Sequence, residues 1–416
     1  MTAQGISEDV RRKTMPGIGA LAVRPPGNRM FGRVVVAAVV LACLLALPFG
    51  SASAAGTSGW SVQWLPVPSS AVTVPLSCSS SAACTAVAAY YPFPSSDSDI
   101  LLAVRWNGRG WSRQVMAAPA GSVTALVGGI SCPSGSSCIA VGGFTSGDRP
   151  TRYVPLVERW NGTAWSVERV PAPAGVRLSS RLTGVSCTSP TACTAMGESA
   201  SPAGATSLVE RWDGTTWSIE RATGGSLLSV SCTSRLACTA VGHAGNETLG
   251  EGWNGSRWSI QPNPHPRGFG GPGGANELGS VSCASSDACI GVGDSSWGSG
   301  FNPVRITLAE DWYGSDWSVE PTPSPIQLDE LNSVSCSSTR ACVAVGDYTD
   351  RAGDATLPLV ERSRSGRWSV VSTPRNVSTG KAADATLLAV ACFANGNCLA
   401  IGDAEGGPFS AQFSSN

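Results

Sequence analysis

The chain has 416 residues, of which 42% are hydrophobic and 14% are charged, and its formal net charge is −1. A chain with nearly balanced charge has no electrostatic reason to bind nucleic acid or an anionic membrane surface, so neither is expected as a partner. The length permits more than one domain, but the internal repeats described below override a domain count based on length alone.

The first segment has the three parts of a secretory signal peptide. Basic residues precede an apolar run at 34–47, and the small residues 52–54 follow as a cleavage signal. We interpret residues 1–55 as a signal peptide and expect a secreted protein with no membrane span after cleavage, because the apolar run is short for a span. Two alternatives stay open. Residues 40–43 loosely match a lipoprotein cleavage box that ends at Cys43, and an uncleaved run would anchor the N-terminus in a membrane.

Beyond the leader, fourteen cysteines form seven pairs, and five residues separate the members of each pair. The pairs are Cys78/Cys84, Cys132/Cys138, Cys187/Cys193, Cys232/Cys238, Cys283/Cys289, Cys336/Cys342 and Cys392/Cys398. An even number of cysteines in an exported protein indicates disulfides. A zinc site would need paired short spacings or histidines, and the chain has only two histidines. We predict one disulfide per pair, each worth about 2 kcal/mol in the chain-entropy model, and no metal or other cofactor.

The cysteine pairs recur at intervals of 54, 55, 45, 51, 53 and 56 residues, and each interval carries four short segments. In the third repeat these are residues 182–187, 193–197, 208–212 and 217–220. Each segment is rich in Val, Ile or Trp and is bounded by turn-forming residues, which is typical of a strand. Residues 56–416 are therefore predicted to form an all-β, seven-bladed β-propeller with four antiparallel strands, A to D, in each blade.

The two ends of the repeat array are complementary. Residues 60–68 match residues 165–173, so the array opens with a D strand that has no A, B or C strand before it. The last repeat reaches its third strand at 409–413 and has no D strand of its own. We predict that the N-terminal strand completes the last blade and covers an edge that would otherwise invite aggregation.

Two recurring positions predict how blades pack. One strand-A position is always small, because the first strands of neighbouring blades are expected to converge near the axis. Its residues are Ser77, Ser131, Ser186, Ser231, Ser282, Ser335 and Ala391. Paired tryptophans such as Trp212 and Trp217 are expected to fill the wider gap between outer strands.

The Val-Ser-Cys, Ala-Val-Gly and Glu-Arg-Trp-Asn-Gly-x-x-Trp-Ser elements resemble the repeats of a group of exported actinobacterial proteins. The resemblance covers essentially all of the chain after residue 58. It implies a propeller fold and an exported location, and it implies no activity. A more distant likeness is to Asp-box and Kelch-type propellers. Residues 213–217 are one residue shorter than the Asp-box of sialidases and lack its leading serine, so a shared activity is not inferred.

Five glutamates at one strand-C position suggest a glycosidase, because those enzymes use paired carboxylates. They are Glu158, Glu210, Glu251, Glu310 and Glu361. Equivalent positions around a ring point away from one another, so we expect them to pair with arginines such as Arg159 and Arg211 instead. Residues 293–295 resemble an esterase nucleophile turn, but neither histidine is spaced to act as the base. We predict no catalytic residues.

Polar residues directly follow the strand-B glycine in five repeats. They are Glu198, His243, Asp294, Asp347 and Asp403. A ring of such groups near the axis would hold a cation through oxygen ligands. Strand B is not the innermost strand of a propeller blade, so we favour turn residues that accept local backbone N–H groups and predict no metal site.

Aromatic residues outside the repeated positions fall mainly in the B–C and D–A links, which open on one face. The candidate ligand-binding residues are Tyr90, Tyr91, Phe93, Phe144, Phe269, Trp297, Phe301 and Tyr348. Exposed aromatics stack on sugars and anchor protein partners; the alternative is that these rings pack the loops on themselves. Trp297 and Phe301, in a long insertion of the fifth repeat, are the strongest candidates.

The function predicted from these features is a monomeric, exported, non-catalytic module that binds a cell-wall glycan or a surface protein. The alternative is an extracellular hydrolase or lyase with its site at the central channel. A histidine or a cluster of carboxylates in the channel would favour that alternative.

Overall fold

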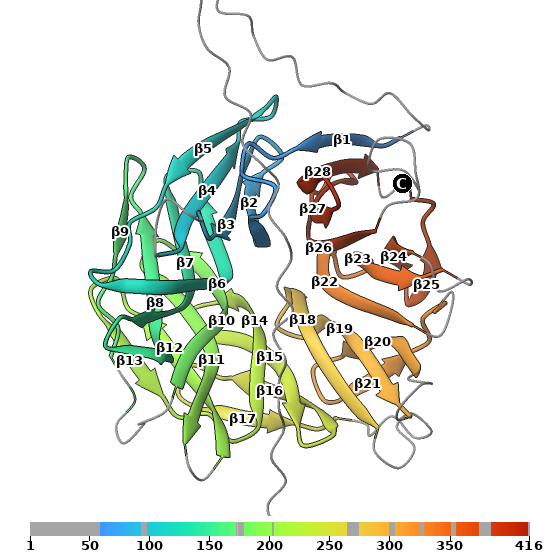
Figure 1. The fold of residues 1–416 in the computed structure, drawn as a ribbon. Coiled ribbons are helices and arrows are strands. Elements are labelled where there is room, and N and C mark those ends of the chain that lie inside the picture. The colour runs from blue at the N-terminus through green and yellow to red at the C-terminus, as the bar shows by residue number, and fades with distance from the viewer. Residues whose placement is uncertain are drawn as a thin grey trace, which may run out of the picture. The chain divides into compact units, whose positions relative to one another are not determined.

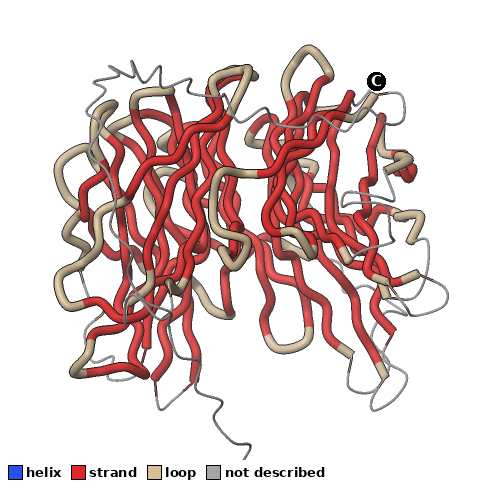
Figure 2. Tube along the Cα trace, turned by 45° about the horizontal axis from the view of Figure 1, so that its top comes forward, coloured by secondary structure: helices blue, strands red, loops and turns tan. Residues whose placement is uncertain are grey.

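The computed structural model describes residues 59–92, 98–171, 173, 179–201, 204–263, 274–298, 304–324, 328–350, 355–373 and 384–414. The chain divides into two units, Met1–Gly50 and Ser51–Asn416, and every described residue lies in the second. The predicted signal peptide, with Cys43, is outside the described residues. Within them all regular elements are strands, and no helix is long and apolar enough to span a membrane (Figure 2).

Twenty-eight strands form seven four-stranded antiparallel sheets, which stand as blades around a ring (Figure 1). Blades 1 to 3 comprise β2 (Val72–Ser80), β3 (Ala83–Tyr90), β4 (Ile100–Trp106), β5 (Trp111–Val115); β6 (Ser122–Ser134), β7 (Ser137–Ser146), β8 (Arg149–Trp160), β9 (Trp165–Val167); and β10 (Ser179–Ser189), β11 (Ala192–Ser201), β12 (Gly204–Trp212), β13 (Trp217–Glu220). Blades 4 and 5 comprise β14 (Ser226–Ser234), β15 (Ala237–Ala244), β16 (Glu247–Trp253), β17 (Trp258–Gln261); and β18 (Ala275–Ser285), β19 (Ala288–Trp297), β20 (Val304–Trp312), β21 (Trp317–Glu320). Blades 6 and 7 comprise β22 (Asp329–Ser338), β23 (Ala341–Thr349), β24 (Thr356–Arg364), β25 (Arg367–Val370); and β26 (Ala385–Cys392), β27 (Asn397–Ala404), β28 (Gly407–Ser414), β1 (Ser61–Trp64). The predicted seven-bladed β-propeller is confirmed.

Blade 7 is completed by the N-terminal strand, as predicted. Strand β1 pairs antiparallel with β28, in a register that sets Ser61 opposite Gln412. Trp60 stacks on Phe413 with ring centroids 4.2 Å apart. In blades 1 to 5 the equivalent place is filled by a tryptophan pair, such as Trp212 and Trp217 at 5.7 Å. The last blade therefore has a comparable aromatic pair, made by strands from the two ends of the array.

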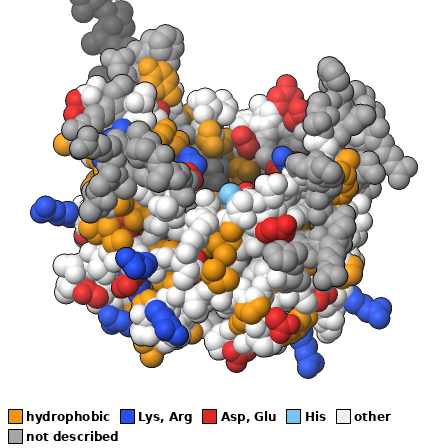
Figure 3. All heavy atoms as spheres, turned by 90° about the horizontal axis from the view of Figure 1, so that it is seen from below, with side chains coloured by type: hydrophobic (Ala, Val, Ile, Leu, Met, Phe, Trp, Pro, Cys, Tyr) orange, Lys and Arg blue, Asp and Glu red, His pale blue; other side chains and the backbone are white. Residues whose placement is uncertain are grey.

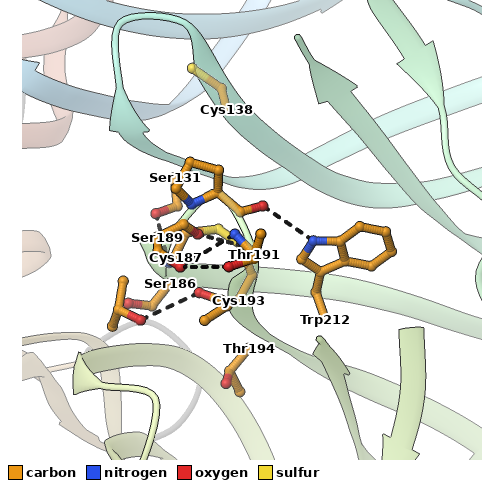
Figure 4. The surroundings of a disulfide bond; sticks show 12 residues. Ser131, Cys138, Ser186, Cys187, Ser189, Thr191, Cys193, Thr194 and Trp212 are labelled. Atoms are coloured by element: carbon orange, nitrogen blue, oxygen red, sulfur yellow. Dashed lines mark hydrogen bonds between the residues drawn. A yellow bond between two sulfur atoms is a disulfide. The ribbon is translucent and has the colours of Figure 1, made fainter. Parts of the chain in front are cut away.

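The strand-A serine is a bridge between blades as well as a small residue. Its hydroxyl accepts a hydrogen bond from the backbone N–H of the cysteine in the next blade, for example Ser131 from Cys187 at 2.9 Å (Figure 4). The same bond, 2.9 to 3.0 Å long, recurs in the other blades, with the cysteine N–H as donor and the serine hydroxyl as acceptor: Cys132 to Ser77, Cys232 to Ser186, Cys283 to Ser231, Cys336 to Ser282 and Cys392 to Ser335. At the junction of blades 7 and 1 the position is Ala391, which has no hydroxyl.

The glycine of the Ala-Val-Gly element permits a β-bulge in strand A. In blade 3 the register shifts between Leu182 and Gly184, and a Cβ on Gly197 would lie 2.0 Å from the Arg181 carbonyl oxygen. No side chain fits in that space, so glycine is required. Blade 1 has Ala88 at this position, and there the irregularity spans Thr73 to Leu76.

All seven predicted disulfides are present, each between strands A and B of its own blade: Cys78–Cys84, Cys132–Cys138, Cys187–Cys193, Cys232–Cys238, Cys283–Cys289, Cys336–Cys342 and Cys392–Cys398. In blade 3, Cys187 and Cys193 are direct cross-strand partners with their Cα atoms 4.0 Å apart. The first cysteine of the pair thus bonds to strand B through its sulfur and to the preceding blade through its N–H group.

The second cysteine of each pair differs from the predicted simple staple, because it also contacts the preceding blade. All seven of these strand-B cysteines are buried: Cys84, Cys138, Cys193, Cys238, Cys289, Cys342 and Cys398. In three blades the sulfur lies beside the hydroxyl of a strand-B threonine of the blade before: Cys138 beside Thr85 (3.8 Å), Cys238 beside Thr194 (3.7 Å) and Cys289 beside Thr239 (3.5 Å). A disulfide sulfur has no hydrogen, so the threonine is the donor in each pair.

Cys84, at the junction of blades 7 and 1, is an exception to this threonine contact. The preceding blade has Leu399 at the threonine position, and Cys84 packs with it and with Trp106 in a buried apolar cluster. Its sulfur also lies 3.5 Å from the Ser80 carbonyl oxygen, which is a close contact and not a hydrogen bond, since the oxidised sulfur cannot donate. Spacing in the sequence predicted the seven pairs but not these contacts, because they join residues of different repeats.

The serine bridge leads to a paired stability prediction. Ser186→Ala should lower the free energy of unfolding by about 1 kcal/mol, because the Cys232 N–H loses its acceptor. Ala391→Ser, which adds a hydroxyl at the junction that has none, should raise the free energy of unfolding. Denaturant unfolding under non-reducing conditions measures both, with Ser259→Ala on exposed β17 as the control. Equal effects of Ser186→Ala and Ser259→Ala would contradict the bridging role.

Candidate ligand-binding face

The links between strands are sorted onto two faces. The B–C side bonds to the beginning of strand A: Asp99 N–H, in the β3–β4 link, donates to the Val123 carbonyl near the start of β6 (2.9 Å), and Thr349 N–H, at the end of β23, donates to the Leu328 carbonyl just before β22 (3.1 Å). A–B turns instead bond to the ends of strand C, as Trp212 Nε1–H does to the Pro190 carbonyl (3.2 Å). We call the first the loop face and the second the turn face. The predicted aromatic residues that the structure describes, Tyr90, Tyr91, Phe144, Trp297 and Tyr348, belong to the loop face.

The structure places these aromatics in different environments. Trp297, at the end of β19, is half-buried and lines a pocket. Phe144 and Tyr348 pack against buried core clusters. Tyr91 is 48% exposed, beside half-buried Tyr90 at the end of β3. Phe93, Phe269 and Phe301 lie outside the described residues. A role in ligand binding stays a prediction for the whole set.

The pocket beside Trp297 lies between blades 5 and 6 and has a volume of about 460 Å³. Trp297 and Arg305 come from blade 5, and Glu330 and Asp347 from blade 6. A backbone bridge between Arg305 and Leu328 holds the two blades together at this point. The pocket therefore combines one aromatic ring with a cation and two carboxylates, on the face where the aromatic residues of the sequence predicted a binding site.

Arg305 is the centre of the charges in this pocket. Its guanidinium forms ion pairs with Glu330 and, at 3.6 Å, with Asp294. Burial raises the pKa of Asp294 to about 6, and the negative charges of Glu330 and Glu277 act in the same direction, while Arg305 opposes the rise. Asp294 therefore takes up a proton in mildly acidic conditions, close to the pocket wall.

Neighbouring carboxylates extend this cluster around the inner strands. Burial raises the pKa of Glu330, with the charge of Asp347 as the next cause. Asp347 accepts hydrogen bonds from the Thr386 hydroxyl (2.5 Å) and from Asn332 Nδ2 (3.4 Å). On the blade 4 side, His243 Nε2 lies 3.8 Å from Glu277. In Figure 3 a histidine and acidic side chains lie at a notch in the upper edge of the molecule.

The interpretation of the residues after the strand-B glycine needs correction. All five lie within strand B, opposite strand A, and are not turn residues: Glu198 faces Arg181, with 2.7 Å between Oε1 and the guanidinium. Asp403 does accept a local backbone N–H, that of Ala404 at 3.0 Å. In the described part of the chain, no group of three His, Cys, Asp or Glu residues is arranged to hold a metal ion.

The predicted pairing of the strand-C glutamates with arginines is wrong. All five glutamates are buried, and four of them accept hydrogen bonds from the D–A link that enters their own blade: Glu158 Oε2 accepts the Ala117 N–H at 3.0 Å, and Glu251 accepts the Thr223 N–H at 3.2 Å. The arginines lie on the other side of strand C, where Arg159 packs over Trp212 of the next blade with 5.6 Å to the ring centroid. Side chains of adjacent strand residues point to opposite faces, so the two cannot meet.

Sequence reasoning missed Arg305 and Glu330. Arg305 was visible as a lone basic residue at the end of the fifth-repeat insertion that carries Trp297. Its pairing with Glu330 depends on the contact of blade 5 with blade 6, and no spacing within one repeat reports that contact.

Comparison with known proteins shows the fold and no function. No known protein family and no curated protein sequence matches this chain. Among solved structures, 285 chains are similar. The structure of U3-55K has a TM-score of 0.52 and 9% identity, covering 85% of this chain and 98% of its own. A protein of unknown function from Dyadobacter fermentans DSM 18053 has a TM-score of 0.50 and 8% identity, covering 86% and 100%. At such identities the similarity establishes the propeller fold alone.

The buried glutamates predict a pH-dependent stability. Burial raises the pKa of Glu210 to about 8, so the folded chain keeps a proton that the unfolded chain releases above its ordinary value of 4.5. The free energy of unfolding should therefore fall as the pH rises from about 5 to 8. Glu210→Gln, which cannot ionise, should reduce this fall and be more stable than the wild type at pH 8.

Thermal unfolding at pH 5 and pH 8 measures this effect. The control is Glu405→Gln, which alters an exposed glutamate in the turn between β27 and β28. If Glu210→Gln and the wild type lose the same stability between the two pH values, Glu210 is not protonated in the folded protein.

Proposed function

We propose that this protein is an exported, non-catalytic binding module that holds a cell-surface glycan in the pocket between blades 5 and 6. The observation that supports it is the meeting of Trp297 with Arg305, Glu330 and Asp347 in one pocket on the loop face. Loops carried on a rigid scaffold are common places for binding residues.

The chemistry of the pocket suits a sugar. An indole ring offers an apolar surface on which the C–H face of a pyranose can stack. Carboxylates and a guanidinium accept from and donate to hydroxyl groups, and charged hydrogen bonds are the stronger ones. Neither feature alone selects a glycan, but a ligand with one apolar face and many hydroxyls uses both.

An exported location is supported by the disulfides. Seven of them, one in each blade, are typical of an extracellular protein, because the cytosol keeps thiols reduced. With the apolar run at 34–47 and the small residues at 52–54, they favour secretion through a cleaved signal peptide.

A hydrolase or lyase is the second candidate, and the carboxylate cluster favours it. Asp294, with a pKa of about 6, lies beside Arg305, and the negative charge of Glu330 contributes to the rise of that pKa. A perturbed carboxyl in a cleft is a common property of general acids. We prefer binding because Asp294 and Glu330 are both engaged by Arg305.

Trp297→Ala tests the binding site. A glycan array with the mature protein first identifies a ligand, and calorimetry then compares variants. Loss of the stacking surface should weaken binding at least about tenfold, which corresponds to 1.4 kcal/mol. Tyr313→Ala, at a 59% exposed tyrosine on the turn face, is the control and should bind like the wild type. Unchanged affinity of Trp297→Ala would refute the site, and cleavage of the bound glycan, assayed in parallel, would establish the enzyme instead.

A further inference from the structure

A second pocket lies on the turn face, between blades 6 and 7. It has a volume of about 670 Å³. Three arginines line it, Arg340 from the A–B turn of blade 6 and Arg362 and Arg364 from the end of β24. The described lining has no acidic residue and includes the serines Ser337, Ser338 and Ser365. The pocket is thus strongly basic in a chain whose formal net charge is −1.

Blade 6 departs from the repeat in strand C, beside the arginines of this pocket. The residue of strand C opposite the second cysteine is tryptophan in blades 1 to 5 and Phe413 in blade 7. In blade 6 it is Ser363, opposite Cys342. In blades 1, 3 and 5 this tryptophan donates Nε1–H to a carbonyl of the A–B turn, as Trp312 does to Ser286 (3.2 Å); in blade 6 the Ser365 N–H donates to the Arg340 carbonyl of that turn (3.0 Å). Neighbouring strand residues point to opposite faces, so the buried Ser363 faces blade 5 together with Cys342, and Arg362 faces blade 7 and the pocket.

The turns around the pocket differ from the repeat as well. The C–D hairpin of blade 6 closes through Ser365 and Gly366, with φ of 52° and 77°, and its strands pair one step further, at Arg364 and Arg367. Blades 1 to 4 use a loop in which an Asn or Asp side chain accepts backbone N–H groups, as Asp213 does from Thr215. The extra strand pair extends β24 to Arg364 at the pocket rim.

We propose that this pocket binds a ligand that carries phosphate groups. Guanidinium groups match phosphate oxygens in pairs of parallel hydrogen bonds, which favours arginine at phosphate sites. Serine hydroxyls supply further donors. The volume is in the range of small-molecule pockets and exceeds what one inorganic phosphate ion needs, so the ligand has several phosphates or a phosphodiester backbone. The site is on the face opposite the glycan pocket and does not depend on it.

Calorimetry with inorganic phosphate, tripolyphosphate and a glycerol phosphate oligomer tests the proposal with the folded, disulfide-bonded protein. We expect tripolyphosphate or the oligomer to bind, with an affinity that falls as salt is added. Binding of the oligomer alone assigns the site to a phosphodiester polymer, and binding of tripolyphosphate alone assigns it to a free oligophosphate. No binding of any probe at millimolar concentration overturns the proposal.

Two variants distinguish the effect of the arginine charges from the effect of the pocket volume. Arg340→Gln combined with Arg364→Gln alters two exposed residues and should weaken binding at least tenfold. Ala394→Trp adds an indole ring at an exposed lining residue from blade 7, keeps every arginine and should abolish binding by filling the pocket. Arg257→Gln, in the C–D turn of blade 4, removes one charge elsewhere and should not change the affinity. Wild-type binding by Ala394→Trp, with unchanged melting temperature, would show that the phosphate binds outside this pocket.

Discussion

The ring depends on the hydrogen bond from the first cysteine N–H of each of blades 2 to 7 to the serine of the preceding blade. First strands that converge on an axis have no room for large side chains, and a backbone N–H that points to the neighbouring blade needs an acceptor. A serine meets both demands, as Ser131 does for Cys187. The disulfide then fixes that cysteine to the second strand, so packing between blades and pairing within a blade meet at one residue.

The other repeated residues also join one blade to the next. Glu158 holds the link that enters its blade, and Arg159 reaches a tryptophan of the blade that follows. The tryptophan that begins the fourth strand often donates to the outer strand of the blade before it, as Trp165 does to Gln114 at 3.3 Å. Because the repeated residues are occupied in this way, function has to reside where repeats differ. Trp297 and Arg364 both lie at such differences.

Most of the fold could be predicted from the sequence because its signals are local and periodic. Cysteine spacing, strand pattern and the match of residues 60–68 to 165–173 determined the blade number, the disulfides and the closing strand. The glutamate–arginine pairing failed because it ignored the alternation of side chains along a strand. The pocket around Arg305 needed a contact between two blades. The replacement of tryptophan by Ser363 was visible in the sequence, but the face of the strand on which this residue lies required the register that sets it opposite Cys342.

Closure by β1 has a consequence for the order of events during biosynthesis. The Ser410 hydroxyl donates to the Gln63 carbonyl across 347 positions of sequence, so one of the first strands to leave the ribosome pairs with one of the last. Each middle blade can assemble as soon as its own fifty or so residues emerge. Blade 7 cannot, and β28 keeps a bare edge until the two ends meet. A chaperone that meets the chain before closure therefore has a defined target: one unpaired strand at each end of a nearly finished ring.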